Sequence, residues 1–353
     1  MDKYFISGIQ QVGVGIPELQ KAWKWFRINF GMDVKIFEDA GSAELMLRYT
    51  GNKPQKRHAV LAVNMQGGGG MEIWQYTERV SQPCPFEIQV GDLGINICKI
   101  KSPDIAKAFE NLKNLGCKML SEIVKNPSDE DTFFVQDPYN NIFQIVGSQV
   151  WFSQTKKNTG GTGGCIIGVK DIDHALNLYS GILGYDEVVY DKSGIFGDLQ
   201  TLPGGKEEFR RVLLREKENR KGPFVNLFGK SEIELVQVNN RKAKDIFEGR
   251  QWGDMGFIHL CFDICHMNDL KDVCEKAGFP FTIDTGEVFQ MGSAAGRFAY
   301  CEDGSGTLIE FVETYKVPIL KKFGFYLDLT KRNREKPLAN WMLKALGMNK
   351  VKD

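Results

Sequence analysis

The sequence predicts an α+β fold in which four βαβββ motifs form two cupped, mixed-sheet modules. The main observation is a pattern that occurs four times: a short apolar strand, an amphipathic helix, several strands and an apolar last strand. The second observation is that the first two copies correspond to the last two. The third is the polar, glycine-rich segment SQTKKNTGGTGG at residues 153–164, whose composition is typical of a linker between two halves.

One helix follows the first strand of each copy, and apolar residues at helical spacing mark all four. The first is expected to begin near Pro17. The second is expected to begin at Ser102 and Pro103, an N-cap residue followed by proline at the first helical position. The remaining two are expected to end near Gly184 and at Gly278, because glycine commonly terminates helices.

The last strand of each copy is apolar, which indicates burial in a sheet. These strands are expected at residues 71–76, 141–147, 233–238 and 308–313. In the second and fourth copies a turn precedes the strand, with the sequences DPYNN and DGSG. The alternation of the two types supports the correspondence between the halves.

The repeat predicts three parts of the chain. Residues 6–150 contain motifs 1 and 2, and residues 162–316 contain motifs 3 and 4. Residues 317–353 form a C-terminal extension outside the repeat. Within it, residues 338–348 (LANWMLKALGM) are expected to form a helix that packs back on the core.

Composition narrows the class of protein. Lys+Arg and Asp+Glu both number 45 in the 353 residues, which argues against a nucleic-acid binder. No apolar run reaches membrane-spanning length, and the N-terminus lacks a secretory signal. The eight cysteines are scattered and form no CxxC pair, as expected of free thiols. We therefore expect a cytoplasmic monomer or homodimer that acts on a small molecule, with no nucleic-acid or membrane partner.

Histidine is rare in this chain, with four in all, and one lies in a strand that is expected to be buried. His259 stands between Ile258 and Leu260 in the sequence GFIHLCFDI. It is either a core histidine with satisfied hydrogen bonds or a metal ligand. Glu310 raises a similar question, because an unpaired carboxylate in an apolar strand is costly to bury.

The βαβββ repeat, with QVGVGIPEL opening the first copy and DGSGTLIEFVE closing the last, resembles the vicinal oxygen chelate superfamily. Glyoxalase I, extradiol dioxygenases and bleomycin resistance proteins belong to that group. The resemblance covers roughly residues 6–315. It implies that pairs of motifs curl into cups around a divalent metal. The ligands then come from the first and last strand of each motif.

The resemblance assigns one ligand position to each of these strands. The first-strand positions are Gln11, Ile95, Gly164 and His259, and the last-strand positions are Glu72, Gln144, Glu234 and Glu310. If neighbouring copies pair, each cup lacks a ligand. If the first copy pairs with the fourth, one cup holds all the good ligands, which are Gln11, Glu72, His259 and Glu310. The second arrangement is favoured, because random loss would not often sort the ligands so cleanly.

This ligand set matches that of glyoxalase I of the human type. Two carboxylates offset a divalent charge, and an imidazole and a carboxamide oxygen complete the shell with room for substrate. One ion of Zn²⁺, Ni²⁺, Co²⁺, Mn²⁺ or Fe²⁺ would suit these ligands. Glu234 is expected to have a buried pairing partner or a water in place of a metal.

The resemblance implies a lyase or isomerase that moves a proton through a metal-bound enediolate or enolate of a small oxygenated substrate. Glu310 would be the catalytic base, and Glu72 the second acid or base. Gly15, Tyr76 and Met255 replace the polar residues that bind glutathione in glyoxalase I, so glutathione is not expected as a cosubstrate. The alternatives are a metal-free binding or resistance protein and an extradiol-type dioxygenase. The dioxygenase fits less well because its iron site needs two histidines.

Overall fold

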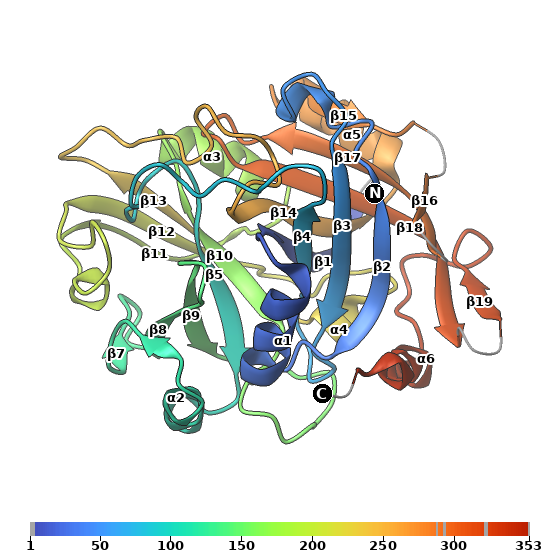
Figure 1. Cartoon of the computed structure of the whole chain (residues 1–353), viewed down its shortest axis with the longest axis horizontal. Helices are drawn as coiled ribbons and strands as arrows, with labels where there is room; N and C mark the ends of the chain where they lie inside the picture. Colours follow the sequence, from blue (N-terminus) through green and yellow to red (C-terminus); the bar gives the residue numbers. More distant parts are fainter. Residues whose placement is uncertain (1–3, 287–288, 292–293, 321–323, 352–353) are drawn as a thin grey trace.

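The computed structural model describes residues 4–286, 289–291, 294–320 and 324–351 of the chain. Two curled sheets of mixed direction lie beside each other, and the helices pack on them (Figure 1). This arrangement confirms the predicted α+β class with two cupped modules. No helix within the described ranges has both the length and the apolar character needed to cross a membrane.

The first sheet combines motifs 1 and 4. Its ten strands in the described residues have the main order β15-β17-β18-β14-β1-β4-β3-β2. Motif 1 supplies β1 (Phe5–Gly15), α1 (Leu19–Phe30), β2 (Val34–Ser42), η1 (Leu47–Tyr49), β3 (Lys56–Val63) and β4 (Gly70–Tyr76). Motif 4 supplies β14 (Gly256–Cys265), α5 (Met267–Lys276), β15 (Phe281–Asp284), β16 (Phe289–Met291), β17 (Ala294–Glu302) and β18 (Leu308–Leu320).

The second sheet combines motifs 2 and 3, with the main order β11-β12-β13-β10-β5-β9-β8-β6. Motif 2 supplies β5 (Gly94–Ser102), α2 (Ile105–Asn114), β6 (Lys118–Met119), β7 (Val124–Lys125), β8 (Asp131–Gln136) and β9 (Ile142–Gly147). Motif 3 supplies β10 (Thr162–Gly168), α3 (Ile172–Tyr179), β11 (Glu187–Gly194), η2 (Gly197–Leu199), β12 (Phe209–Arg215), α4 (Val225–Phe228) and β13 (Glu232–Val238).

The first strands of the motifs join the two halves of the chain. β1 pairs antiparallel with β14, and β5 pairs antiparallel with β10. Motif 1 therefore shares a sheet with motif 4, and motif 2 shares one with motif 3, as the sorting of ligands predicts. Each half of the sequence contributes one motif to each sheet.

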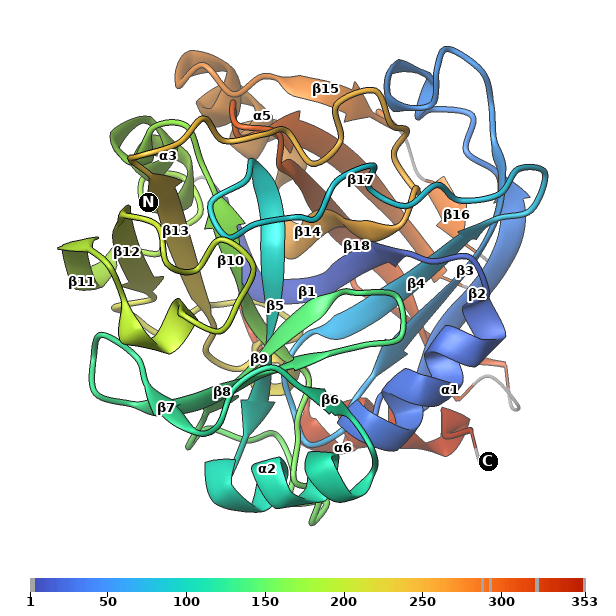
Figure 2. The ribbon, with the colours of Figure 1, turned by 60° about the vertical axis from the view of Figure 1, so that its left-hand side comes forward.

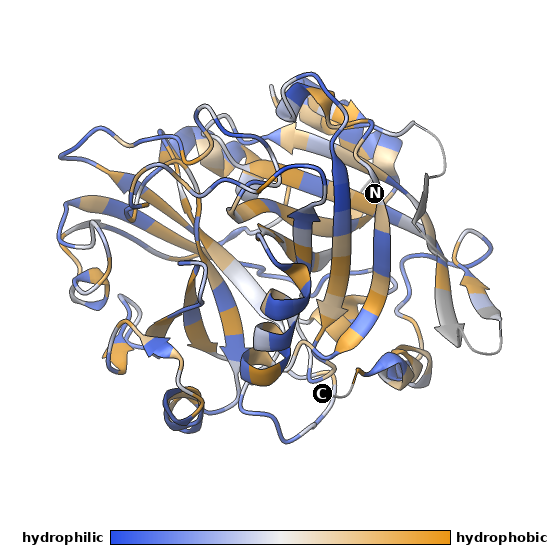
Figure 3. Ribbon diagram, in the orientation of Figure 1, coloured by the Kyte–Doolittle hydropathy of each residue, from blue (hydrophilic) through white to orange (hydrophobic). Residues whose placement is uncertain are grey.

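The helices lie where their apolar faces can be buried. α1 packs beside β3 and β4, and α2 packs beside β8 and β9 (Figure 2). The buried face of α1 consists of Leu19, Ala22, Trp23, Phe26, Asn29 and Phe30. Figure 3 shows apolar residues gathered along the strands of both sheets, as expected for two sheets that share a core.

One expected helix start is wrong. The N-cap of α2 is Asp104, whose side chain accepts a hydrogen bond from the backbone N–H of Lys107. Ser102 is the last residue of β5, and its hydroxyl accepts from the N–H of Asp104. The aspartate captures the free N–H group of the first turn, so the helix begins beyond Pro103.

The C-terminal extension packs against the first sheet. β18 continues to Leu320, where β19 (Phe325–Asp328) pairs with it. The expected helix is present as α6 (Asn340–Ala345) followed by η4 (Leu346–Asn349). Its apolar side chains join an apolar cluster with Val34, Val63 and the residues of α4. The extension therefore closes one side of the first sheet.

Candidate metal centre

Four side chains meet on the inner face of the first sheet, one from each of its neighbouring strands β1, β4, β14 and β18. They are Gln11, Glu72, His259 and Glu310. Glu72 pairs in register with Gly13, two residues after Gln11. Glu310 pairs with Cys261, two residues after His259. The two motifs thus place their polar residues at equivalent positions, because residues two apart share a face of a strand.

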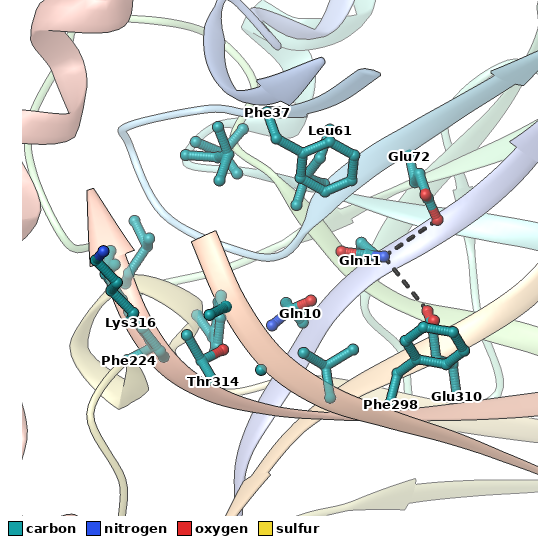
Figure 4. A pocket seen from close by; sticks show the side chains of 18 of the residues that line it. Gln10, Gln11, Phe37, Leu61, Glu72, Phe224, Phe298, Glu310, Thr314 and Lys316 are labelled. Atoms are coloured by element: carbon teal, nitrogen blue, oxygen red, sulfur yellow. Dashed lines mark hydrogen bonds between the residues drawn. The ribbon is translucent and has the colours of Figure 1, made fainter. Parts of the chain in front are cut away.

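The polar atoms of this cluster lie close together. The Nε2 atom of His259 is 3.1 Å from Oε2 of Glu72 and 3.2 Å from Oε2 of Glu310. The Nε2 atom of Gln11 lies 3.2 Å from Oε2 of Glu72 and 3.4 Å from Oε2 of Glu310 (Figure 4). Ligands bound about 2 Å from one ion are themselves about 3 Å apart, so these separations suit a shared metal.

Burial makes the charge of this cluster a strong constraint. His259 is fully buried, and Glu72 and Glu310 are each 7% exposed. Burial raises the pKa of Glu310, and the neighbouring Glu72 charge adds to this effect although His259 opposes it. Burial also opposes protonation of His259, yet the nearby Glu310 and Glu72 carboxylates raise its pKa. Two buried carboxylates therefore need a positive partner.

The cluster fits a divalent ion. Among the described residues, Oε1 of Gln11 and Nδ1 of His259 are buried without a hydrogen-bond partner, and Nε2 of His259, although close to both carboxylates, makes no aligned hydrogen bond. The candidate ligand atoms of Glu72, His259 and Glu310 all lie within 4.8 Å of one another. The set of one imidazole and two carboxylates, with the carboxamide beside them, is the donor chemistry that Zn²⁺ and similar ions accept.

A β-bulge decides which glutamine joins the cluster. The register of β1 against β14 shifts between Ile9 and Gln11, which leaves Gln10 as the extra residue. A bulge turns a side chain toward a new direction. Gln10 therefore also faces the cavity beside the cluster, and it does not replace Gln11.

Sequence reasoning missed three residues that position the cluster. Gly13 lies opposite His259 in the sheet, and a Cβ atom there would be 2.4 Å from the imidazole Cε1. Trp252 stacks on the His259 ring at a centroid distance of 6.0 Å. The Tyr300 hydroxyl donates a 2.7 Å hydrogen bond to Oε1 of Glu310, whose Oε2 atom faces the cluster. Of these three residues, only Gly13 could have been found from the sequence, because a glycine within a strand often marks a place where another group approaches the backbone closely.

Comparisons with known proteins bear on the fold of the chain. Residues 8–145 match the family model of the Glyoxalase/Bleomycin resistance protein/Dioxygenase superfamily. This match covers motifs 1 and 2, so that part of the chain is similar to members of the superfamily. No curated protein matches the chain in sequence.

Two solved structures share the fold over most of this chain. A putative dioxygenase from Bacillus subtilis is 12% identical, covers 88% of this chain and 86% of its own, and superposes with a TM-score of 0.59. Glyoxalase I from Zea mays is 12% identical, covers 87% of this chain and 92% of its own, and has a TM-score of 0.54. At this identity the likeness establishes the fold and not the reaction.

The second cup, formed by motifs 2 and 3, differs from the first. Gln144 pairs with Lys99 and Glu234 with Ile166, so the equivalent first-strand positions are Ile97 and Gly164. The expected position Ile95 is therefore wrong by two residues. Neither Ile97 nor Gly164 offers a side-chain atom that could bind a metal. The ligand set of the second cup is therefore incomplete at both first-strand positions.

Cations of the chain itself occupy the second cup. Lys99 Nζ lies 3.0 Å from Oε2 of Glu234 and 2.6 Å from Oε1 of Glu232. Arg211 lies 2.6 Å from the other oxygen of Glu234 and also pairs with Asp198. Although burial opposes ionisation, these cations lower the pKa of Glu234 to about 2. The expected buried partner of Glu234 is thus a lysine and an arginine.

A cavity of about 140 Å³ adjoins the cluster. Gln11, Glu72 and Glu310 line its inner end (Figure 4), while His259 is not among its lining residues. Its walls are otherwise mainly apolar and include Phe37, Leu61, Phe224, Leu227, Phe298 and Leu346. These residues come from the first sheet, from the segment around α4 and from η4, so the second module and the C-terminal extension complete the cavity.

Proposed function

We propose that the protein is a divalent-metal-dependent lyase or isomerase of glyoxalase type, acting by proton transfer on a small oxygenated substrate. The observation that carries this proposal is the meeting of Gln11, Glu72, His259 and Glu310 at the inner end of an apolar cavity. Such a site combines a charged centre with walls that exclude water.

Gln11, Glu72, His259 and Glu310 would hold the ion. The Gln11 amide must turn so that its oxygen faces the centre, and its Oε1 atom has no other partner to lose. An ion bound there would supply Lewis acidity, which stabilises negative charge that develops on a substrate oxygen. The remaining chemistry belongs to the side chains.

Glu310 is the proposed base. Tyr300 holds its Oε1 atom, so the Oε2 atom is the one presented to the centre. Without a bound ion, burial raises the pKa of this carboxyl group, whereas a bound cation would favour the carboxylate form that has to accept the proton. The proton moves from the carbon next to a carbonyl to Glu310. Delivery of that proton by Glu310 to the adjacent carbon completes an isomerisation. Delivery of a different proton by a protonated Glu72 to the opposite face of the same carbon completes an epimerisation, and neither reaction needs an oxidant.

We do not expect glutathione as a cosubstrate of the proposed reaction. Gly15 lies against the backbone oxygen of Asp254, and Tyr76 is buried with its hydroxyl bonded to the backbone oxygen of Trp252. Neither residue lines the cavity, and Met255 lines a different pocket. The positions that bind glutathione in glyoxalase I therefore offer no polar contact here.

We also propose a cytoplasmic location, supported by the eight free cysteines.

The proposal predicts metal-dependent exchange of a carbon-bound proton with solvent. The protein, loaded in turn with each candidate ion, would be incubated in deuterated water with 2-hydroxyketones, hemithioacetals and 2-substituted acyl thioesters. We expect deuterium in at least one class, detected by mass spectrometry, and a loss of exchange after chelation that metal restores. Exchange that survives chelation would contradict the proposal. A protein that binds these compounds but exchanges none would support the binding-protein alternative.

A further inference from the structure

We propose that the substrate carries an apolar body about the size of one ring and, at the end remote from the metal centre, an anionic group that Lys316 binds. The assignment of the oxygenated inner end of this substrate rests on the proposed function, whereas the assignment of the anionic outer end rests on the cavity lining alone. Lys316 would then determine specificity without touching the reacting atoms.

The cavity has two distinct ends along one strand. Glu310, Val312, Thr314 and Lys316 are alternate residues of β18, and all four line the cavity. Because a strand rises about 3.3 Å per residue, the backbones at Glu310 and Lys316 are about 20 Å apart. Figure 4 shows Lys316 on the opposite side of the cavity from Gln11, Glu72 and Glu310. A bound molecule can therefore contact both ends only if it is elongated.

The space between the two ends suits an apolar group. Phe37, Leu61, Phe224 and Phe298 contribute aromatic and aliphatic walls. The cavity volume of about 140 Å³ is close to that of an apolar protein cavity that holds benzene. A polar body would lose its hydration there and would find few partners, since Gln10 and Thr314 are the polar side chains between the two ends.

Among the described residues, Lys316 is the cation of this cavity that has no carboxylate partner. Arg297 also lines the cavity, but Asp284 binds its guanidinium at 2.8 and 2.7 Å. Lys316 is exposed and stands 4.4 Å above the ring of Tyr326, and among the described residues no carboxylate pairs with it. Asp328, opposite Lys316 in the sheet, is 3.4 Å from Lys331 instead.

The charge pattern determines how the substrate is oriented. The two carboxylates at the inner end repel an anion unless an ion is bound there, whereas Lys316 attracts one at the outer end. A molecule with oxygens at one end and a carboxylate at the other end therefore has one favourable orientation. That orientation brings the oxygenated end to Glu310.

Two matched probes test this inference without any turnover. Binding of 4-phenylbutyrate and 4-phenylbutan-1-ol would be measured by calorimetry, on the purified protein and after chelation of metal. We expect the acid to bind about fivefold more tightly than the alcohol, as an exposed charge pair allows. Added salt should reduce this ratio, because the interaction is screened.

Variants locate the charge that is responsible. In Lys316→Met the ratio of the affinities for the acid and the alcohol should fall to about one. In Lys316→Glu the alcohol should bind more tightly than the acid. Lys336→Met is the matched control, because it removes the same charge from an exposed lysine outside the cavity and should leave the ratio unchanged.

The outcomes separate this inference from the proposed function. Equal binding of acid and alcohol, no binding of either probe, or a ratio that Lys316→Met leaves unchanged would each overturn it. If the chelated protein keeps the preference but shows no metal-dependent exchange, the proposed function fails and the acid-binding end stands. If metal-dependent exchange is found but the acid is not preferred over the alcohol, the acid-binding end fails and the proposed function stands.

Discussion

Replacing Glu310 by glutamine is expected to leave the fold intact and to lower proton exchange by a factor of about 10²–10⁴, even at saturating metal. The amide keeps the shape of the side chain and one oxygen that can accept from Tyr300. It removes both the charge and the basicity of the carboxylate, so metal should also bind more weakly. Deuterium exchange and circular dichroism would measure activity and fold.

The matched control is Glu302→Gln on β17, the strand next to β18. Glu302 bonds to Tyr49 and does not line the cavity, so exchange should stay near the wild-type rate. If saturating metal restored the activity of Glu310→Gln, Glu310 would be a ligand only. Glu72 would then be the next candidate for the base.

Replacing Lys99 by methionine is expected to destabilise the protein by about 3 kcal/mol, because Glu232 and Glu234 lose the buried cation that they share and keep only Arg215 and Arg211 as partners. Glu232 and Glu234 each lie within 3.0 Å of the Lys99 ammonium group. Urea unfolding would measure the loss, and metal content should stay unchanged. Adding Glu234→Gln should recover part of the stability, since it removes one of the two carboxylates that have lost the lysine and leaves Arg211 paired with Asp198.

The exposed Lys107 provides the comparison for this prediction. It pairs with Asp104 at 3.0 Å on the surface of α2. Lys107→Met should cost less than about 1 kcal/mol, as is usual for exposed pairs. A Lys99→Met protein that folds well but loses its metal would show that the second cup is the metal site.

The sequence predicted the architecture because the repeat leaves few ways to pair the motifs. The resemblance to the vicinal oxygen chelate superfamily implied the ligand positions, and the residue types at those positions sorted Gln11, Glu72, His259 and Glu310 into one cup. The sheet order agrees with this pairing of motifs. The exact alignment within a strand was less certain. Ile95 was placed two residues from the register position, because Ile97 is equally apolar and only the strand pairing distinguishes the two.

The partners of the cluster could not be predicted in the same way. Lys99 and Glu234 are 135 residues apart and read as ordinary members of two strands until the sheet brings them together. Trp252 lies before β14 in a segment without periodicity, yet its ring covers His259. The contribution of Leu346 to the cavity wall depends on where the C-terminal extension packs, which no local pattern specifies.

The metal content of the purified protein and of two variants tests the central claim most directly. Inductively coupled plasma mass spectrometry would compare the wild type with His259→Ala in the first cup and Gln144→Ala in the second. We predict one divalent ion per chain in the wild type and in Gln144→Ala, and none in His259→Ala. A wild type that holds no divalent ion after reconstitution, or a folded His259→Ala protein that keeps its full metal content, would contradict this account.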